Sequence, residues 1–376
     1  MRVLVAMDSF KESMTSYEAG MAVKKGIEMV NPCVDVIVKC MADGGEGTLS
    51  AIGSSVDICI EKELVKGPLL EEIYAEYGIY GDAAFIEIAK ICGIELIEKA
   101  KRNPLNTTSY GVGQVIKKVL DKGCRKIYIG LGSSATNDCG IGMLSALGVG
   151  FYENNSKIQY PAGKDLEKIN KIIIENEKYL NMINNCDITT LSDVDNPLTG
   201  VNGCSLVFAP QKGADNKMAC AMDNWIKSYS EKVTEFLKYD FTCEPGAGAA
   251  GGLGFALMAF CNGKVSSGAK AIIELEKLEE DIKNADIVIV GEGCMDGQTK
   301  HGKTPYAVAT LAKKHGKKVI AIAGVIKSYD EIRKSGCFDA SFSILSEILE
   351  KNVYLEKSYS IKSLENLSRE LFMLIL

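Results

Sequence analysis

Acidic residues, glycines and hydroxyl-bearing residues gather in five short segments of the sequence, each of which follows an apolar run. The segments cover residues 8–11, 42–48, 132–140, 192–197 and 291–299. Glycine lets backbone N–H groups surround phosphate oxygens, and carboxylates bind Mg²⁺ or accept a proton from a hydroxyl group. Lysine neutralises charge on a phosphoryl group in transfer, and Lys11, Lys212 and Lys303 could do so here. Together, these residue types indicate phosphoryl transfer.

Each segment also has a purely structural alternative. An Asp or Ser after a strand often caps a helix, and residues 193–197 could form a turn in which Asx side chains bond the local backbone. Taken alone, each segment favours that alternative. The combination favours function, because a structural fold has no need of so many acids at strand ends. The acids expected at strand ends are Asp43, Asp138, Asp193, Asp195 and Glu292.

Two matches to nucleotide-binding patterns lie in unsuitable contexts. Residues 297–304 satisfy G-x-x-x-x-G-K-S/T, but the preceding strand is expected to end near Val290, whereas a P-loop follows its strand almost at once. Residues 246–251 fit G-x-G-x-x-G without a buried strand before them or an acid at the expected distance after them. We therefore keep Lys303 as a phosphate contact. We expect the glycines of 246–251 to let a helix over 253–261 pack closely, or to shape a nucleotide pocket.

The elements that position these segments alternate in type along the chain. Short apolar runs are separated by stretches with helical periodicity, a pattern typical of βα units around a largely parallel sheet. Thr15 and Glu18 have the spacing of a capping box before a helix. Strands are predicted over 3–6, 126–131, 205–209, 286–290 and 318–323. Helices are predicted over 111–122, 217–238, 305–315 and 363–376.

Length and composition exclude several classes of protein. The 376 residues predict two domains, or one large α/β unit with an insertion. With 43 basic and 49 acidic residues, net charge −6, no basic surface favours nucleic acid, and no run approaches the about 18 apolar residues of a membrane span. The 13 cysteines include no C-x-x-C pair, which indicates reduced thiols, and only His301 and His315 could serve a histidine site. We expect a cytoplasmic protein without nucleic-acid or membrane partners.

The chain resembles the type I bacterial glycerate kinases along almost its whole length. Members show patterns similar to D-S-F-K-G-S, M-A-D-G-G-E-G-T, R-N-P-x-x-T-T-x-x-G-x-G, G-S-A-T-N-D-G-G, D-V-D-N-P-L, P-Q-K-G-A, P-G-A-G-A-A-G-G-L-G and G-E-G-R-x-D-x-Q-T. The counterparts here are residues 8–13, 41–48, 102–113, 133–140, 193–198, 210–214, 245–254 and 291–299. Eight matches in the same order make the resemblance specific.

The resemblance implies that the protein phosphorylates D-glycerate with ATP and Mg²⁺, giving 2-phosphoglycerate. Such a reaction holds the glycerate hydroxyl in line with the γ-phosphoryl group and neutralises the developing charge. Asp193 is the first choice for the proton acceptor, and Asp8 and Lys11 complete the predicted catalytic set. Glycerate is expected to bind Ser9, Arg102, Thr107 and Thr108, with Lys11 and Arg102 pairing with its carboxylate. The predicted nucleotide contacts are Ser134, Thr136, Asn137, Asp138, Lys212, Gly291 and Lys303. The predicted metal ligands are Asp195, Asp43, Glu46, Glu292 and Asp296.

The resemblance also implies an α/β fold with two α/β domains and an active-site cleft between them. One domain, flavodoxin/Rossmann-like and discontinuous, would combine residues 1–66 with 284–376, and residues 67–283 would form the second. A homodimer is one assembly that we consider.

Three departures from the family patterns and three alternative functions stay open at this point. Glu12 and Cys139 stand where the family usually has Gly. Cys294 stands where the family has Arg, and a thiol cannot replace the charge or the bidentate geometry of a guanidinium group. A non-catalytic metabolite-binding regulator is therefore one alternative. An NAD-dependent hydroxy-acid dehydrogenase would share the α/β pattern, although the sequence lacks a well-placed dinucleotide fingerprint. The third alternative is a kinase that gives 3-phosphoglycerate or acts on another small hydroxy acid.

Overall fold

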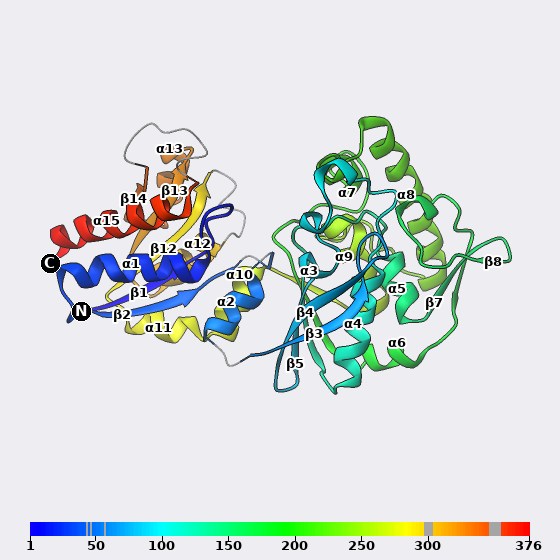
Figure 1. Cartoon of the computed structure of the whole chain (residues 1–376), viewed down its shortest axis with the longest axis horizontal. Coiled ribbons are helices and arrows are strands. Elements are labelled where there is room, and N and C mark those ends of the chain that lie inside the picture. Colours follow the sequence, from blue (N-terminus) through cyan, green and yellow to red (C-terminus); the bar gives the residue numbers. More distant parts are fainter. Residues whose placement is uncertain (43, 46, 56–57, 297–303, 346–354) are drawn as a thin grey trace. The chain divides into compact units, whose positions relative to one another are not determined.

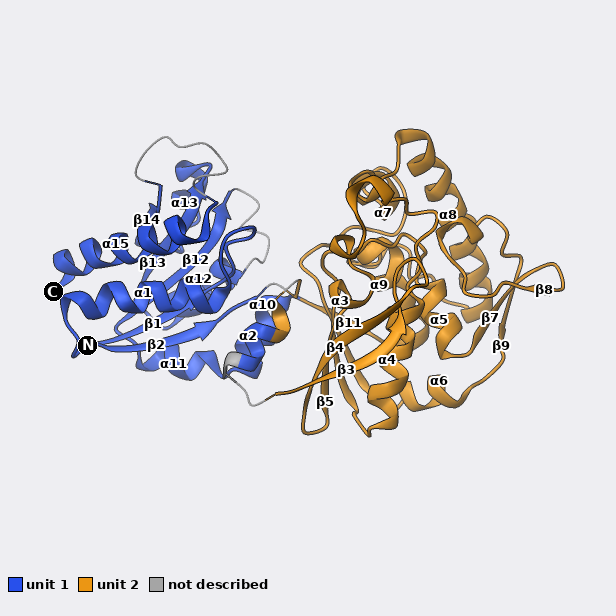
Figure 2. Cartoon of the chain, in the orientation of Figure 1, with its two compact units in different colours: residues 1–43, 50–57, 267–376 blue, residues 44–49, 58–266 orange. Residues whose placement is uncertain are grey.

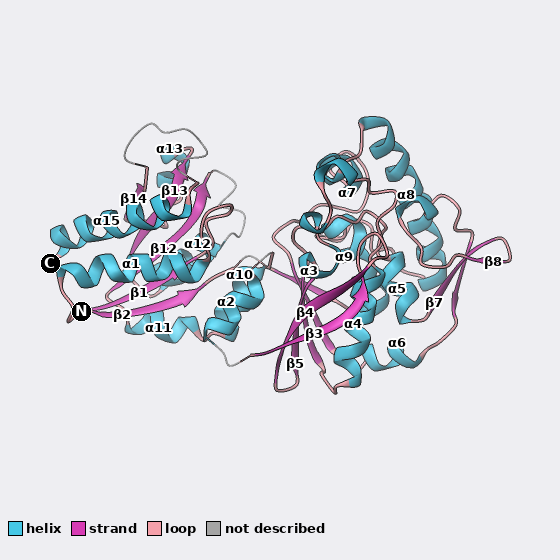
Figure 3. Cartoon of the chain, viewed as in Figure 1, coloured by secondary structure: helices cyan, strands magenta, loops and turns pink. Residues whose placement is uncertain are grey.

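The chain forms two compact units, each built around its own sheet. The computed structural model describes residues 1–42, 44–45, 47–55, 58–296, 304–345 and 355–376 (Figure 1). Unit 1 comprises Met1–Asp43, Ser50–Asp57 and Ser267–Leu376, and unit 2 comprises Gly44–Leu49 and Ile58–Ser266 (Figure 2). Both units combine helices with strands, which confirms the predicted α/β class (Figure 3).

The sheet of unit 1 is parallel throughout and has the strand order of a flavodoxin-like fold. Its order is β14-β13-β12-β1-β2. In chain order within the unit this is 2-1-3-4-5 read from the β2 edge, the doubly wound arrangement of flavodoxins. The strands are β1 (Arg2–Met7), β2 (Asp35–Cys40), β12 (Ile287–Met295), β13 (Lys318–Ile326) and β14 (Ala340–Ser343). Because the unit joins both ends of the chain, it is discontinuous, as predicted.

Helices cover both faces of this sheet because its strands carry apolar side chains on both faces. Alternate residues of a strand point to opposite faces. Val3, Val5 and Met7 of β1 share a core with α1 (Ser16–Val30) and α15 (Lys357–Ile375). On the other face, α12 (Thr304–Lys314) packs on β12 and β13, and α11 (Leu278–Asn284) packs on β1. The capping box is present at α1, where Glu18 N donates to Thr15 Oγ1 and Thr15 N donates to Glu18 Oε2.

Unit 2 contains a mixed sheet of six strands in the order β11-β10-β6-β5-β4-β3. The strands are β3 (Cys59–Lys66), β4 (Glu72–Tyr80), β5 (Ala83–Glu87), β6 (Lys126–Gly130), β10 (Asp187–Leu191) and β11 (Lys264–Ser266). The strands from β5 to β11 pair in parallel, and β3 and β4 form an antiparallel extension. A small antiparallel sheet adds β7 (Val149–Glu153), β8 (Ser156–Lys157) and β9 (Lys171–Ile174).

The helices of unit 2 share one large apolar core with the sheet. Its longer helices are α4 (Tyr110–Asp121), α8 (Asn216–Leu237) and α9 (Ala249–Cys261). Shorter ones are α3 (Ala89–Cys92), α5 (Ile141–Leu147), α6 (Lys178–Ile183) and α7 (Cys204–Phe208). The remaining helices of the described chain are α2 (Thr48–Ser55), α10 (Gly268–Leu275) and α13 (Tyr329–Lys334).

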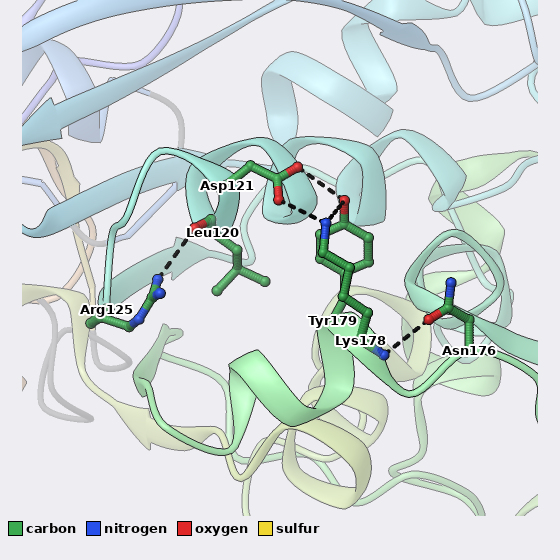
Figure 4. Close-up of polar contacts among 6 residues, drawn as sticks. All are labelled: Leu120, Asp121, Arg125, Asn176, Lys178 and Tyr179. Carbon is green, nitrogen blue, oxygen red and sulfur yellow. Dashed lines mark hydrogen bonds and ion pairs between the residues drawn. The ribbon is translucent and has the colours of Figure 1, made fainter.

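The C-terminal end of α4 is fixed to the start of α6 by polar contacts (Figure 4). Tyr179 Oη donates to Asp121 Oδ2 at 2.9 Å, and Lys178 Nζ donates to Asp121 Oδ1 at 3.3 Å. The hydrogen bond from Tyr179 is the main reason that the pKa of Asp121 lies below its ordinary value. Arg125 Nη1 donates to the carbonyl oxygen of Leu120 at 3.2 Å, which satisfies one of the free acceptors at the helix end.

Most of the predicted elements are confirmed, and two predictions are wrong. Strands at 3–6 and 318–323 and helices at 111–122 and 217–238 are present within one to three residues of their predicted ends. Residues 205–209 are not a strand but lie mostly in α7, which packs on α8 and α9; a short apolar run alone does not distinguish the two states. Residues 291–295 are not a loop but continue β12, because β13 extends equally far and pairs with them.

The domain borders differ in position from the predicted ones. β3, placed in the first domain by the sequence, pairs within the sheet of unit 2. α10 and α11, placed in the second domain, belong to unit 1. None of the helices in the described part of the chain combines the length and apolar composition needed to cross a membrane.

Candidate active site

A cavity of about 430 Å³ in unit 1 lies where β1, β12 and β13 end. It brings together four of the residues predicted from the sequence, Asp8, Ser9, Lys11 and Glu292, and it is also lined by Cys294. In open α/β sheets ligands bind at the carboxyl ends of the strands. The cavity therefore has the position expected of a ligand site, with both carboxylates and a lysine at its wall.

The loop after β1 is held in a tight conformation by its own backbone. Asp8 N donates to Gly291 O at 2.8 Å, which continues the pairing of β1 with β12. Ser9 N donates to Asp8 Oδ1 at 2.6 Å, so the carboxylate turns back onto the loop. Phe10 and Met14 form an antiparallel bridge, and both side chains are buried. The three residues between them, Lys11 to Ser13, are thus presented to the cavity by an anchored loop.

Two glycines in β12 allow neighbouring segments to lie close to the strand, the loop after β1 at Gly293 and strand β13 at Gly291. A β-carbon at Gly293 would lie 3.1 Å from Phe10 Cα and 3.3 Å from Lys11 N. A β-carbon at Gly291 would overlap the carbonyl oxygen of Ile322. Since Glu292 and Cys294 alternate with these glycines, both point to one side of the strand, and both line the cavity. Gly291, predicted to contact nucleotide, has this clear structural role; nucleotide contact stays a prediction.

The predicted loops of unit 2 meet at one edge of its sheet. A β-carbon at Gly44 would lie 2.7 Å from Leu191 Cβ at the end of β10, and one at Gly132 would lie 2.6 Å from Gly45 Cα beyond β6. At the end of β5, Glu87 Oε1 accepts a 2.5 Å hydrogen bond from Leu49 N. Gly44 and Gly45 therefore lie together with Gly132 and the end of β10, as expected for neighbouring parallel strands.

Asp193 and Asp195 follow the end of β10 on this edge. Asp193 is half-buried and Asp195 is exposed. The burial of Asp193 favours it over Asp195 for a role that requires a partly desolvated carboxylate. That Asp193 accepts the proton and Asp195 binds metal stay predictions.

Asp138 is fully buried and joins the beginnings of two helices. Its Oδ2 accepts hydrogen bonds from Ser109 N and Ser109 Oγ, both at 2.8 Å, and from Gly142 N at 3.3 Å. Its Oδ1 accepts one from Gly140 N at 3.2 Å. Burial raises the pKa of Asp138, and these donors act against that effect. A carboxylate at the N-termini of α4 and α5 is favoured by both helix dipoles, so the side chain has a structural role, and nucleotide contact by it stays a prediction.

Lys212 is 3% exposed and holds the loop that precedes Asp138. Its Nζ donates to Ser134 Oγ at 2.9 Å and to the carbonyl oxygen of Thr136 at 2.6 Å. Burial lowers the pKa of Lys212 to about 8. The predicted phosphate contact by this lysine stays a prediction; the structure adds an internal role, because both bonds fix the 132–140 segment.

Several other predicted side chains also bond to their own unit. Thr107 Oγ1 donates to Pro104 O and Ala135 O at 3.2 Å, and Thr108 Oγ1 donates to Pro161 O at 2.6 Å. Asn137 Nδ2 donates to Ser205 Oγ at 2.9 Å. Arg102 Nε donates to Ile97 O at 3.2 Å, while its Nη2 lies 3.6 Å from Glu95 Oε1. These residues, with Thr136, support the loops of unit 2, and their contact with substrate or nucleotide stays a prediction.

The candidate metal ligands form no protein cage in the described chain. Asp43, Glu46 and Lys303 lie outside the described residues. Among the residues that the structure describes, no group of three or more His, Cys, Asp or Glu side chains could hold a metal ion. Asp296 Oδ2 lies 3.9 Å from Lys327 Nζ. Mg²⁺ in kinases is bound by one or two carboxylates with substrate phosphates, so Asp8 and Glu292 on one cavity fit a site of that kind.

Val325, Leu345 and Lys327 line the cavity, although no pattern in the sequence indicates this role. They come from β13 and from the chain that follows β13 and β14, and only the strand order brings them near the loop after β1. Ser109 is also missed, although a Ser two residues before the predicted helix at 111–122 is a signal for a residue at the helix end.

Comparison with known proteins identifies the family of the chain. Residues 3–376 match the Glycerate kinase family. "Glycerate 2-kinase" of Escherichia coli (strain K12) is 41% identical over 350 residues, which cover 93% of this chain and 91% of that protein. "Glycerate kinase" of Halalkalibacterium halodurans is 39% identical over 363 residues, covering 96% and 94%. A crystal structure named for glycerate kinase 2, from Salmonella typhimurium LT2, superposes with a TM-score of 0.86 at 37% identity and covers 100% of this chain and 98% of that one.

These matches extend over both units and give no support to a dehydrogenase or to a non-catalytic regulator. The resemblance inferred from the sequence motifs is confirmed. The chain belongs to the glycerate kinase family of enzymes.

Proposed function

We propose that the protein transfers the γ-phosphoryl group of ATP to the 2-hydroxyl group of D-glycerate, giving 2-phosphoglycerate and ADP. The observation that carries the proposal is the 41% identity to a protein named Glycerate 2-kinase over 93% of this chain. The strand-end cavity with Asp8, Lys11 and Glu292 on its wall supports it, because phosphoryl transfer needs cationic and carboxylate groups of this kind.

In the proposed reaction the glycerate hydroxyl oxygen forms a bond to the γ-phosphorus as the bond from that phosphorus to the bridging oxygen of ADP breaks. We expect Asp193 to accept the hydroxyl proton, and Lys11 and Arg102 to balance the glycerate carboxylate or the phosphoryl charge. Arg102 can do so because its Nη2 lies 3.6 Å from Oε1 of the exposed Glu95, an ion pair that contributes little, while its Nε donates to Ile97 O.

ATP is the expected phosphoryl donor, and Mg²⁺ is expected with it. The metal would neutralise phosphate oxygens, and Asp8 and Glu292 are the described carboxylates that we propose to hold it. A cytoplasmic location and a homodimer stay predictions from the sequence.

The proposal is tested by following ADP formation from ATP and Mg²⁺ with and without D-glycerate. ADP release that depends on D-glycerate is the expected result. L-glycerate is the matched control, and it should give less activity because it presents its 2-hydroxyl group with the opposite hand. An ADP release that does not change when D-glycerate is added would overturn the proposal.

A further inference from the structure

The cavity of unit 1 has two chemically different sides, and the strand order of the sheet explains why. The β1 and β12 side contributes the charged residues Asp8, Lys11, Glu12 and Glu292. The β13 and β14 side contributes Val325 and then Ile344 and Leu345, which follow β14. Since β13 and β14 lie on the far side of β12 from β1, polarity changes across the cavity from charged to apolar.

Phe10 and Lys327 are exceptions to this division. Phe10, in the loop after β1, is apolar, but it is 3% exposed and belongs mainly to the core beneath the cavity. Lys327 follows β13 and is charged; its ammonium group lies 3.9 Å from Asp296 Oδ2, and its side chain is 64% exposed. The apolar side is completed by Leu355, which precedes α15.

Glycerate is a poor match for a cavity of this kind. Every carbon of glycerate carries oxygen, so glycerate would leave the apolar side empty, and its carboxylate would face Asp8 and Glu292. The volume of about 430 Å³ lies in the range of cavities that hold drug-sized ligands, and glycerate would fill only a small part of it.

The nucleoside part of ATP matches both sides. A purine ring is flat and largely apolar at its faces, and it gains from contact with aliphatic side chains. Ribose hydroxyl groups donate hydrogen bonds, and an acid at the end of a strand is a common acceptor for them in α/β nucleotide sites. Lys11 then lies on the same charged side as these acceptors, where phosphate groups would leave the nucleoside.

We infer that this cavity of unit 1 binds the adenine nucleoside of ATP, with Val325 and Leu345 against the base and one of the carboxylates of Asp8 and Glu292 accepting from the ribose, which leaves the other for Mg²⁺. This inference rests on the proposed function and goes beyond it, because it assigns one of the two substrates to a cavity of unit 1.

The inference is tested by substitutions that place a larger side chain on the apolar side of the cavity. Val325 is only half-buried, so Val325→Trp can enlarge the side chain into the cavity without replacing a core residue. Ile326→Trp is the matched control, because the next residue of β13 is also half-buried but points to the opposite face of the strand. Leu345→Trp probes the same side of the cavity from outside the strands.

Calorimetric titration measures the Kd of ATP, of adenosine and of D-glycerate for each folded variant and for the unaltered protein. We expect Val325→Trp and Leu345→Trp to weaken binding of ATP and adenosine by at least about tenfold, while D-glycerate binds as before. Ile326→Trp should leave all three Kd values unchanged. Adenosine isolates the contacts to the nucleoside from those to phosphate.

Other outcomes overturn the inference and identify what replaces it. Weakened D-glycerate binding with unchanged ATP binding would mean that the cavity holds the acceptor. Unchanged Kd values in both cavity variants would mean that neither substrate enters it. Should Val325→Trp fail to fold, Leu345→Trp decides between these results. Failure of the proposed function is recognised separately, because the unaltered protein would then form no ADP in response to D-glycerate.

Discussion

Lys212 donates a 2.6 Å hydrogen bond to the carbonyl oxygen of Thr136, a residue 76 positions earlier in the chain. A second bond from the same ammonium group reaches Ser134 Oγ at 2.9 Å. The lysine therefore fixes the Gly/Ser loop after β6. Its burial lowers its pKa to about 8.

The stability of the protein should depend on pH through Lys212. The pKa of this lysine is about 8 in the folded protein against an ordinary value of 10.5, so between these values the unfolded chain binds a proton that the folded chain has lost. Its contribution to the free energy of unfolding therefore rises with pH across this window and is lost as pH falls through 8. Urea unfolding of the unaltered protein and of Lys212→Met, at several values between about pH 7.5 and pH 9.5, isolates this contribution. A difference between the two proteins that stays constant or falls with rising pH would contradict the assigned pKa.

Gly293→Ala should damage activity more than stability. The new β-carbon would press on Phe10 Cα and Lys11 N, so the loop that presents Lys11 must move. We expect kcat/KM to fall by about tenfold or more and the free energy of unfolding to fall by about 1–3 kcal/mol. Gly53→Ala is the control, because Gly53 is exposed on α2 and a β-carbon there meets nothing within 4 Å. Equal kinetics for Gly293→Ala and the control would show that the loop position is unimportant.

Glu12 should prefer glycine to alanine. Its φ of 66° lies in the left-handed region, where a β-carbon is strained. Glu12→Gly should therefore be more stable than Glu12→Ala by about 1 kcal/mol, measured by chemical denaturation. The order should reverse at Glu28, an exposed residue of α1, where alanine is favoured over glycine by about 1 kcal/mol. The same order at both positions would argue against the left-handed conformation at Glu12.

Asp193→Asn should remove most of the activity while substrates still bind. The amide keeps the shape of the carboxylate but cannot accept the hydroxyl proton, so kcat should fall by about a hundredfold or more with KM values little changed. Asp195→Asn, two residues further and exposed, should have a smaller effect on kcat. Activity of Asp193→Asn within a few-fold of the unaltered protein would exclude Asp193 as the base.

The parts of the fold that local sequence determines could be predicted. The run from Val3 to Met7 is apolar throughout and buried, and Thr15 with Glu18 forms the capping box that begins α1. Periodicity alone located α4 and α8. The glycines at 246–251 do allow close packing, since a β-carbon at Gly251 would overlap the carbonyl oxygen of Thr136.

The parts that depend on distant partners could not be predicted. Cys294 is in a strand because it pairs with Val325, and no local pattern reveals that partner. Lysine side chains are usually exposed. The burial of Lys212 follows only from the fold, which brings the loop with Ser134 and Thr136 to it. The loops of the candidate site could therefore be predicted from the sequence, while the hydrogen bonds that support them required the structure.

The identity of the phosphorylated product tests the central claim most directly. The unaltered protein is incubated with ATP, Mg²⁺ and D-glycerate, and the product is analysed by phosphorus NMR. The proposed function predicts a single new phosphate monoester resonance that coincides with added 2-phosphoglycerate. Formation of 3-phosphoglycerate would contradict the proposed acceptor hydroxyl, and a spectrum in which ATP remains unconsumed would contradict the kinase activity itself.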